Sequence, residues 1–285
     1  MNPTGKISAD FERTLANLLR ARFPYLYVAT WEEARALQLV TAAAKDVELI
    51  RTERRVLDWS LTKGFTEDGA AVEGDTKQPL KALDFIERFE EPAVFVLKDF
   101  HVVLGAAGRP ADPQVVRRLR DLLPALKHSP SPRNVVFIAP QLTLPLELEK
   151  DVTVLEFELP SFEEIRDVLT QMIDTNRSTG RVVIEVTEED EERLAKAAMG
   201  LTLHEAENAF ARAMVEDGKL DISDVEVVLE EKRQTIRKSG ILEYIKPDLN
   251  IADVGGLQNL KRWLIKRNKC GPACKRDPVS GVIGV

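Results

Sequence analysis

The chain has 285 residues, which is long enough for one large or two modest domains, each with its own core. Hydrophobic residues make up 44% and charged residues 31%, a composition that is typical of a folded globular protein and excludes a disordered one. The net charge of −7 disfavours nucleic-acid binding, which needs a basic surface. No apolar run reaches the roughly 20 residues of a membrane span.

The first part of the chain predicts an α/β domain. Segment 93–97, and segment 134–139 after its first residue, are unbroken apolar runs, and such strands are buried on both faces of a parallel sheet that helices cover. In chain order we expect a helix at 8–22, a strand at 25–30, a helix at 31–45, a strand at 54–60, a polar loop at 62–78, a helix at 79–89, a strand at 93–97, a helix at 113–127, and strands at 134–139 and 152–157.

From Ser161 onward the pattern becomes helical. Ser161 with Glu164 and Thr202 with Glu205 have the spacing of capping boxes, which begin helices. Three further helices are expected at 188–199, 202–217 and 221–236, with a short edge strand at 182–186. A charged connector at 232–248 and the start of another helix at 255–269 follow.

The sequence contains no intact phosphate-binding loop. Its signature, Gly-x-x-x-x-Gly-Lys-Ser/Thr, uses backbone N–H groups and a lysine to hold phosphates. The glycine spacing occurs only for Gly64 with Gly69, before two alanines, and for Gly69 with Gly74, before Asp75 and a threonine. Asp75 would repel a phosphate where the lysine should stand, and the segment does not directly follow an apolar strand. We therefore predict a solvated loop and no working ATPase in this chain.

Two polar residues at strand ends are candidate remnants of a nucleotide site. The run 94–97 followed by Lys98 and Asp99 resembles a Walker B strand, whose Asp holds Mg²⁺, but Phe100 replaces the glutamate that activates water. The alternative is that Asp99 caps the next segment or pairs with Lys98. Gln141, after the next strand, could sense a γ-phosphate or be an ordinary loop residue.

Other polar residues favour plainer interpretations. Three arginines, Arg117, Arg118 and Arg120, could reach a neighbouring subunit's nucleotide, but a solvated helix face is the simpler interpretation. The only cysteines, Cys270 and Cys274, rule out reliance on disulfides through most of the chain, and two thiols without a nearby histidine fall short of a metal site. Residues 1–10 lack a secretory signal pattern. We expect a cytoplasmic protein without a bound metal.

Several segments resemble the divergent AAA ATPase family of cyanobacteria, plastids and other bacteria. Residues 200–213 resemble the lid helix of AAA ATPases, and residues 253–261 resemble the opening segment of an AAA module, which lines the adenine pocket. Segments 94–101, 146–155 and 237–244 carry most of the remaining resemblance, which spans about 23–269. The lid precedes the opening segment, so one module ends and another begins.

The resemblance implies a domain organisation and a set of site residues. We expect a degenerate AAA-like base at 1–160, a helical lid at 161–236, a connector with the opening segment of a second, truncated module at 237–269, and an irregular tail at 270–285. The adenine-pocket residues would be Asp253, Val254, Gly255 and Gly256. A truncation or frameshift near residue 269 would explain why the chain stops before a P-loop.

The resemblance also implies a function. This chain would be the non-catalytic N-terminal module of an ATPase that couples ATP hydrolysis to macromolecular remodelling, with a regulatory, assembly or docking role. ATP and Mg²⁺ belong to the parent family and no cofactor to this chain, and the partners would be proteins or further copies. Two alternatives remain: a stand-alone P-loop-less subunit that acts as a clamp-loader-like scaffold, and a receiver-like signalling domain.

Overall fold

The computed structural model describes residues 6–72, 74–106, 108–180 and 182–238, together with residues 258, 259, 262 and 263. The chain divides into two compact units, Met1–Lys232 and Arg233–Val285. The first unit contains an α/β part, from α1 to β7, which we call the base. It also contains most of the helical part from α6 to α9, which we call the lid.

The base is built on one seven-stranded sheet with the strand order β4-β3-β2-β5-β6-β1-β7. Five neighbouring strands, from β2 to β7 in that order, run parallel, as the apolar runs predict. The elements of the base are α1 (Lys6–Arg20), β1 (Tyr25–Ala29), α2 (Glu33–Lys45), α3 (Val47–Ile50), β2 (Arg55–Ser60), β3 (Gly64–Glu67), β4 (Ala70–Ala71), α4 (Pro79–Arg88), β5 (Ala93–Lys98), η1 (Phe100–Val103), α5 (Pro113–Lys127), β6 (Arg133–Ala139), η2 (Leu146–Leu148) and β7 (Val152–Leu155).

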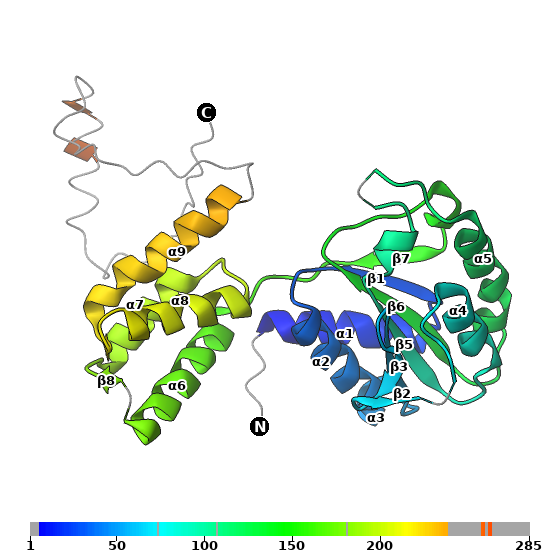
Figure 1. The fold of residues 1–285 in the computed structure, drawn as a ribbon, viewed down its shortest axis with the longest axis horizontal. Helices are drawn as coiled ribbons and strands as arrows, with labels where there is room; N and C mark the ends of the chain where they lie inside the picture. The colour runs from blue at the N-terminus through cyan, green and yellow to red at the C-terminus, as the bar shows by residue number, and fades with distance from the viewer. Residues whose placement is uncertain are drawn as a thin grey trace. The chain divides into compact units, whose positions relative to one another are not determined.

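Helices cover both faces of this sheet. α4 and α5 pack on one face over an aromatic core around Phe95 and Phe137, whereas α1 and α2 pack on the other over aliphatic residues such as Val96 and Ile138 (Figure 1). Alternate residues of β5 and β6 therefore contribute to two separate hydrophobic cores, because successive side chains of a strand point to opposite faces. This arrangement explains why both strands are apolar at nearly every position.

The polar segment 62–78 is only partly the loop that the sequence predicts. β3 and β4 form an antiparallel extension of the sheet beside β2, and Phe65 is buried within it. Two glycines of the false phosphate-binding signature belong to this hairpin: Gly64 begins β3, and Gly69 lies in the turn between β3 and β4. At Gly64, φ is 77° and an added Cβ would lie 2.7 Å from Thr76 Oγ1, so only glycine fits without strain. The sequence did not predict β3 because polar and apolar residues alternate over only four positions in this polar segment.

The lid is a bundle of helices with its own core around Leu169, Leu194 and Phe210. Both predicted capping boxes are present, with reciprocal hydrogen bonds at Ser161–Glu164 and at Thr202–Glu205. The predicted edge strand pairs in parallel with a second short strand that the sequence analysis missed. The elements are α6 (Phe162–Thr179), β8 (Val183–Ile184), α7 (Glu188–Ala198), α8 (Leu203–Glu216), β9 (Lys219–Leu220), η3 (Ile222–Asp224) and α9 (Val225–Lys238).

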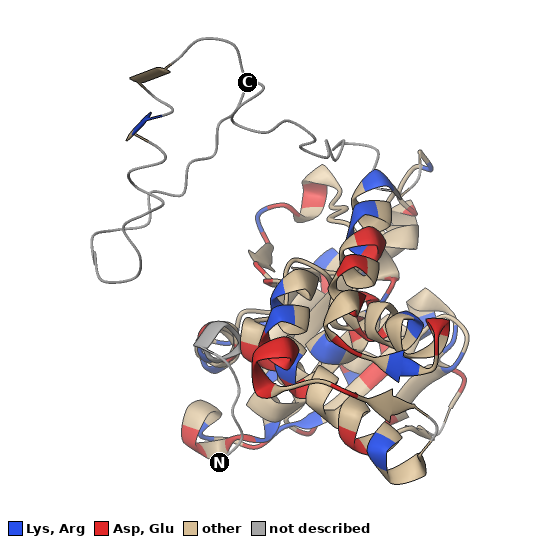
Figure 2. Ribbon diagram, turned by 90° about the vertical axis from the view of Figure 1, so that its left-hand side faces the viewer, with Lys and Arg blue, Asp and Glu red and all other residues tan. Residues whose placement is uncertain are grey.

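Acidic and basic residues are interspersed along the base and along the lid (Figure 2). The interspersion fits a chain whose net charge is modest for its length. Among the described helices, none is long and apolar enough to cross a bilayer.

Candidate functional site

The candidate site lies at the carboxyl ends of the parallel strands. In open α/β sheets, ligands bind in the crevice outside these ends. A P-loop would join a strand to the helix that follows it. Here β1 and α2 are joined by only three residues, Thr30, Trp31 and Glu32, none of which is glycine or lysine.

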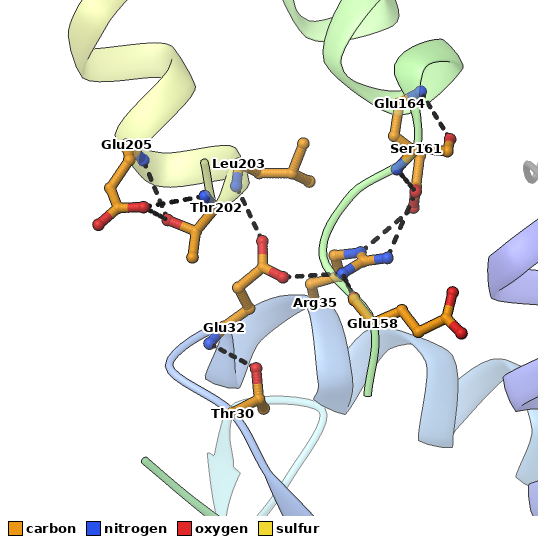
Figure 3. Close-up of polar contacts among 9 residues, drawn as sticks. All are labelled: Thr30, Glu32, Arg35, Glu158, Ser161, Glu164, Thr202, Leu203 and Glu205. Carbon is orange, nitrogen blue, oxygen red and sulfur yellow. Dashed lines mark hydrogen bonds and ion pairs between the residues drawn. The ribbon is translucent and has the colours of Figure 1, made fainter. Parts of the chain in front are cut away.

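Glu32 places a carboxylate at this position. Its side chain is only 6% exposed, and Arg35 Nη1 donates to Glu32 Oε2 at 2.7 Å. The other carboxylate oxygen, Oε1, accepts a hydrogen bond of 2.8 Å from the backbone N–H of Leu203, the first residue of α8 in the lid (Figure 3). The first N–H groups of a helix have no partner within it and carry partial positive charge, so a carboxylate is a favourable acceptor there.

Arg35 joins the base to the lid a second time. Its guanidinium donates to Glu164 at 3.2 Å and 3.3 Å and to the backbone carbonyl of Glu158 at 2.9 Å (Figure 3). The guanidinium also lies 4.7 Å from the centre of the Phe157 ring. The Arg35 side chain is 9% exposed and has two carboxylate partners, so its charge is compensated despite burial.

The two capping boxes of the lid orient these contacts. Glu164 accepts a hydrogen bond from the backbone N–H of Ser161 at 2.8 Å while it binds Arg35. Thr202 caps α8 immediately before Leu203, whose N–H points to Glu32. The base therefore meets the helix beginnings of α6 and α8 through an Arg35–Glu164 pair and a Glu32–Leu203 hydrogen bond.

Asp99 follows β5, at the same edge of the sheet. Its side chain is 62% exposed and makes no cap hydrogen bond, and its φ of 53° lies in the left-handed region that Asp tolerates better than most residues. Lys98 does not pair with Asp99 but lies 2.6 Å from Asp58 and 3.5 Å from Glu33. Burial alone would lower the pKa of Lys98, but Asp58 and Glu33 raise it above its ordinary value.

Gln141 lies after β6 with an exposed side chain, and its backbone carbonyl accepts a hydrogen bond of 2.6 Å from the Tyr27 hydroxyl. Asp99 and Gln141 thus follow neighbouring parallel strands, and no described contact joins them. The predicted adenine-pocket residues Asp253, Val254, Gly255 and Gly256 lie outside the described residues. Among the described residues no cluster of potential metal ligands occurs.

The arginines of α5 form ion pairs on the base itself. Arg118 pairs with Asp84 and Glu87 of α4, and Arg117 pairs with Asp121 one turn along the same helix. Arg120 is exposed. The expected solvated face thus describes Arg117 and Arg120, whereas Arg118 is only 20% exposed and lies against α4.

Exposed apolar side chains follow the carboxyl ends of four neighbouring strands of the sheet. Trp31 after β1 is 80% exposed, Leu61 after β2 is 55% exposed, and Leu142 after β6 is 51% exposed. Val102, in η1 after β5, is 47% exposed. Single exposed apolar residues need no explanation, but a set that follows four strands of one sheet edge fits a surface for protein contact.

Sequence reasoning missed Glu32 and Arg35. Their spacing of three residues on a helix start is a common surface pattern, and the partners on the lid are more than 120 residues away. The capping boxes predicted where the lid helices begin but carried no information on which base residues would meet them.

Two family models match the chain. That of the SpoVK-like AAA ATPase N-terminal domain covers residues 11–157, and that of the SpoVK-like AAA ATPase second domain covers residues 163–239. A relative from Guillardia theta, called uncharacterized AAA domain-containing protein ycf46, is 33% identical over 265 residues, or 91% of this chain and 48% of the relative. A protein of the same name from Trieres chinensis is 30% identical over 259 residues, or 90% of this chain and 48% of the relative. The chain thus spans about half the length of these curated relatives.

Two solved structures share the fold. C. elegans PCH-2 matches with a TM-score of 0.51 at 11% identity, and the match covers 82% of this chain and 70% of the PCH-2 chain. A chain of the E. coli MS115-1 HORMA:CdnC:Trip13 complex has a TM-score of 0.51 at 12% identity, with 78% of this chain and 86% of that chain covered. At such identities the likeness concerns the fold alone.

Proposed function

Because the chain belongs to the SpoVK-like AAA ATPase family, we propose that it serves as a non-catalytic module of an AAA-type ATPase. In this proposal the whole protein couples ATP hydrolysis to remodelling of a macromolecule. The present chain has a regulatory, assembly or docking role. The observation that carries the proposal is the replacement of a P-loop by the turn 30–32, with the buried Glu32 carboxylate in it.

Electrostatics supports an inactive site. A P-loop offers a lysine and several N–H groups to phosphates. The turn 30–32 instead holds a carboxylate that already accepts the N–H of Leu203 and the guanidinium of Arg35. Two unit charges of like sign 4 Å apart repel by about 4 kcal/mol at an effective dielectric constant near 20. Arg35 offsets part of this repulsion, but its single guanidinium is shared by Glu32 and Glu164, so the group keeps a net negative charge that disfavours a nucleotide phosphate beside it.

Isothermal titration calorimetry with Mg-ATP tests this part of the proposal. We expect no binding that depends on the carboxyl edge of the sheet, so wild type and Asp99→Ala should give the same heats. Tight binding of Mg-ATP that Asp99→Ala abolishes would contradict the proposal, because it would place a metal-bound nucleotide at the end of β5. Binding that is unchanged in Asp99→Ala would have another location.

The docking role rests on the exposed apolar side chains that follow β1, β2, β5 and β6. We propose that another AAA module covers them. The family is that of AAA ATPases, and the matched curated relatives are about twice as long as this chain. The same edge that would hold a nucleotide in an active module would then hold a protein partner.

Sedimentation analysis of this chain, alone and mixed with the part of the Guillardia theta relative that it does not match, tests the docking role. We expect association that the double variant Trp31→Ser/Leu142→Ser weakens by at least tenfold. Val215→Ser is a matched control, since Val215 is 77% exposed on α8 in the lid. Absence of association, or equal weakening by the control variant, would refute docking at the carboxyl edge.

A further inference from the structure

A second site lies at the opposite edge of the sheet, where the strands begin. A pocket of about 500 Å³ opens there beside the end of α1, the end of α3 and the residue that precedes β2. Four arginines line it, namely Arg20, Arg22, Arg51 and Arg54, together with polar residues that include Asn17 and Thr52. None of the described residues that line this pocket carries a carboxylate.

Arg54 is the buried member of this group. It is 2% exposed, and its guanidinium donates to the Asn134 side chain and, at 2.7 Å, to the backbone carbonyl of Leu19. Its Nε is buried without a hydrogen-bond partner. Burial and, to a smaller extent, the nearby positive charge of Arg22 together lower the pKa of Arg54 to about 10. Buried charges in proteins are ordinarily paired, so this guanidinium lacks a counter-charge.

Arg133 shows how the same fold treats a buried arginine with a structural role. It is 6% exposed and donates to the backbone carbonyls of Ile86, Glu87, Phe89 and Ala125. Burial lowers the pKa of Arg133, whereas the carboxylates of Glu87 and Glu90 act to raise it. The Nε of each arginine is buried without a partner, so the difference lies elsewhere: Arg54 has fewer acceptors than Arg133, and the charge acting on it is that of another arginine.

The exposed arginines concentrate more positive charge at this mouth. Arg22 donates to the backbone carbonyl of Ser129 at 2.8 Å, a contact that leaves its charge uncompensated. Arg22 and Arg51 also have positive φ, 59° and 65°. Glycine usually takes such positions after a helix, so an arginine there carries a conformational cost.

Helix ends do not neutralise the cluster. The C-terminal ends of α1 and α3 lie at the pocket, and each helix end carries at most about half a negative elementary charge. Two ends therefore offset roughly one of the four guanidinium charges. An excess of about three positive charges remains in a pocket whose walls are partly buried. Guanidinium forks match the oxygens of phosphate groups in bidentate geometry.

We propose that this pocket, lined by Arg20, Arg22, Arg51 and Arg54, binds a small anion that carries two or more linked phosphate groups. A single carboxylate would leave about two of the three excess charges uncompensated, and one phosphate, with a charge of about −1.5 to −2, would still leave roughly one. The site is separate from the carboxyl edge, and it does not depend on the proposed function. A nucleotide diphosphate and free pyrophosphate share this chemistry.

Calorimetry of the full chain with tripolyphosphate, pyrophosphate, ADP, orthophosphate and citrate tests the proposal. We expect saturable binding of tripolyphosphate at least tenfold tighter than that of orthophosphate, weakening with added salt. The variants Arg51→Gly and Arg20→Gln should each lower the affinity by about tenfold. Arg51→Gly suits the test because glycine adopts positive φ without strain, so this variant should keep the melting temperature of wild type. Arg120→Gln removes another exposed arginine, on α5 away from this pocket, and should change nothing.

The ligands separate the possible outcomes. Tighter binding of ADP than of pyrophosphate would identify a nucleotide as the source of the linked phosphates, and equal binding would identify free polyphosphate. Citrate that binds as tightly as tripolyphosphate would overturn the phosphate assignment. Absence of saturable binding, or binding unchanged in Arg51→Gly and Arg20→Gln, would overturn the site itself.

Discussion

Replacing Arg35 with methionine is the sharpest test of the link between base and lid. The substitution keeps an aliphatic side chain of similar length but removes the guanidinium that binds Glu32, Glu164 and the Glu158 carbonyl. Glu32 and Glu164 are 6% and 15% exposed, so two carboxylates would remain near each other without their cation. Removing one partner of a buried ion pair costs about 3–5 kcal/mol.

The lower end of that range applies here, because Glu32 keeps the Leu203 N–H and Glu164 keeps the Ser161 N–H. A loss of about 3 kcal/mol corresponds to a fall in the melting temperature of roughly 6–12 °C for a chain of this size. Differential scanning calorimetry and urea unfolding measure both quantities.

A surface ion pair provides the control for this experiment. Arg193 pairs with Glu189 on α7, with side chains 57% and 73% exposed, so Arg193→Met should cost at most about 1 kcal/mol. The combined variant Arg35→Met/Glu32→Gln should be less destabilised than the sum of the two single variants, because the second change removes an uncompensated charge. If Arg35→Met stays within about 1 kcal/mol of wild type, the buried-pair reasoning is wrong.

Further predictions concern the cap of α8, the core of the base and the pH dependence of stability. Thr202→Ala should cost about 1 kcal/mol in urea unfolding, through loss of the capping box, and Thr202→Ser should retain most of the stability. Phe137→Ala should cost about 3–5 kcal/mol, because Phe137 is 1% exposed and contacts Tyr25, Tyr27 and Phe100; a cost below about 1 kcal/mol would contradict this packing. The pKa of Lys98 is raised in the fold above 10.5, so its ion pairs stabilise fully below about pH 10.5 and are lost as the pH rises further. The free energy of unfolding of Lys98→Met should therefore be lower than that of wild type at pH 7. The two values should converge in unfolding experiments as the pH rises above about 10.5.

The architecture of the base was largely accessible from the sequence. Strands β5 and β6 are apolar at nearly every position because helices cover both of their faces, and that pattern predicts a parallel sheet. The capping boxes at Ser161 and Thr202 located the starts of α6 and α8 because the interaction spans only three residues. The resemblance to AAA ATPases rested on similar local segments.

The contacts that shape the candidate site were not accessible in this way. The Glu32–Leu203 hydrogen bond joins residues 171 positions apart, and no sequence pattern around either residue predicts the other as its partner. β3 and β4 escaped prediction because four-residue and two-residue strands leave too little alternation to count. Asp99 and Gln141 follow strand ends as expected, and their nucleotide roles remain predictions.

Arg133 has a consequence for how the base opens. One guanidinium holds carbonyls at the end of α4 and a carbonyl of α5 from the first position of β6. If either helix end frayed, the buried Arg133 guanidinium would lose carbonyl acceptors. The last turns of α4 and α5 should therefore exchange their amide hydrogens as one cooperative unit. A lysine has no planar fork with which to reach several carbonyls at once. One side chain thus couples the two helix ends to the start of β6, and substituting it should let the ends of α4 and α5 fray independently of each other.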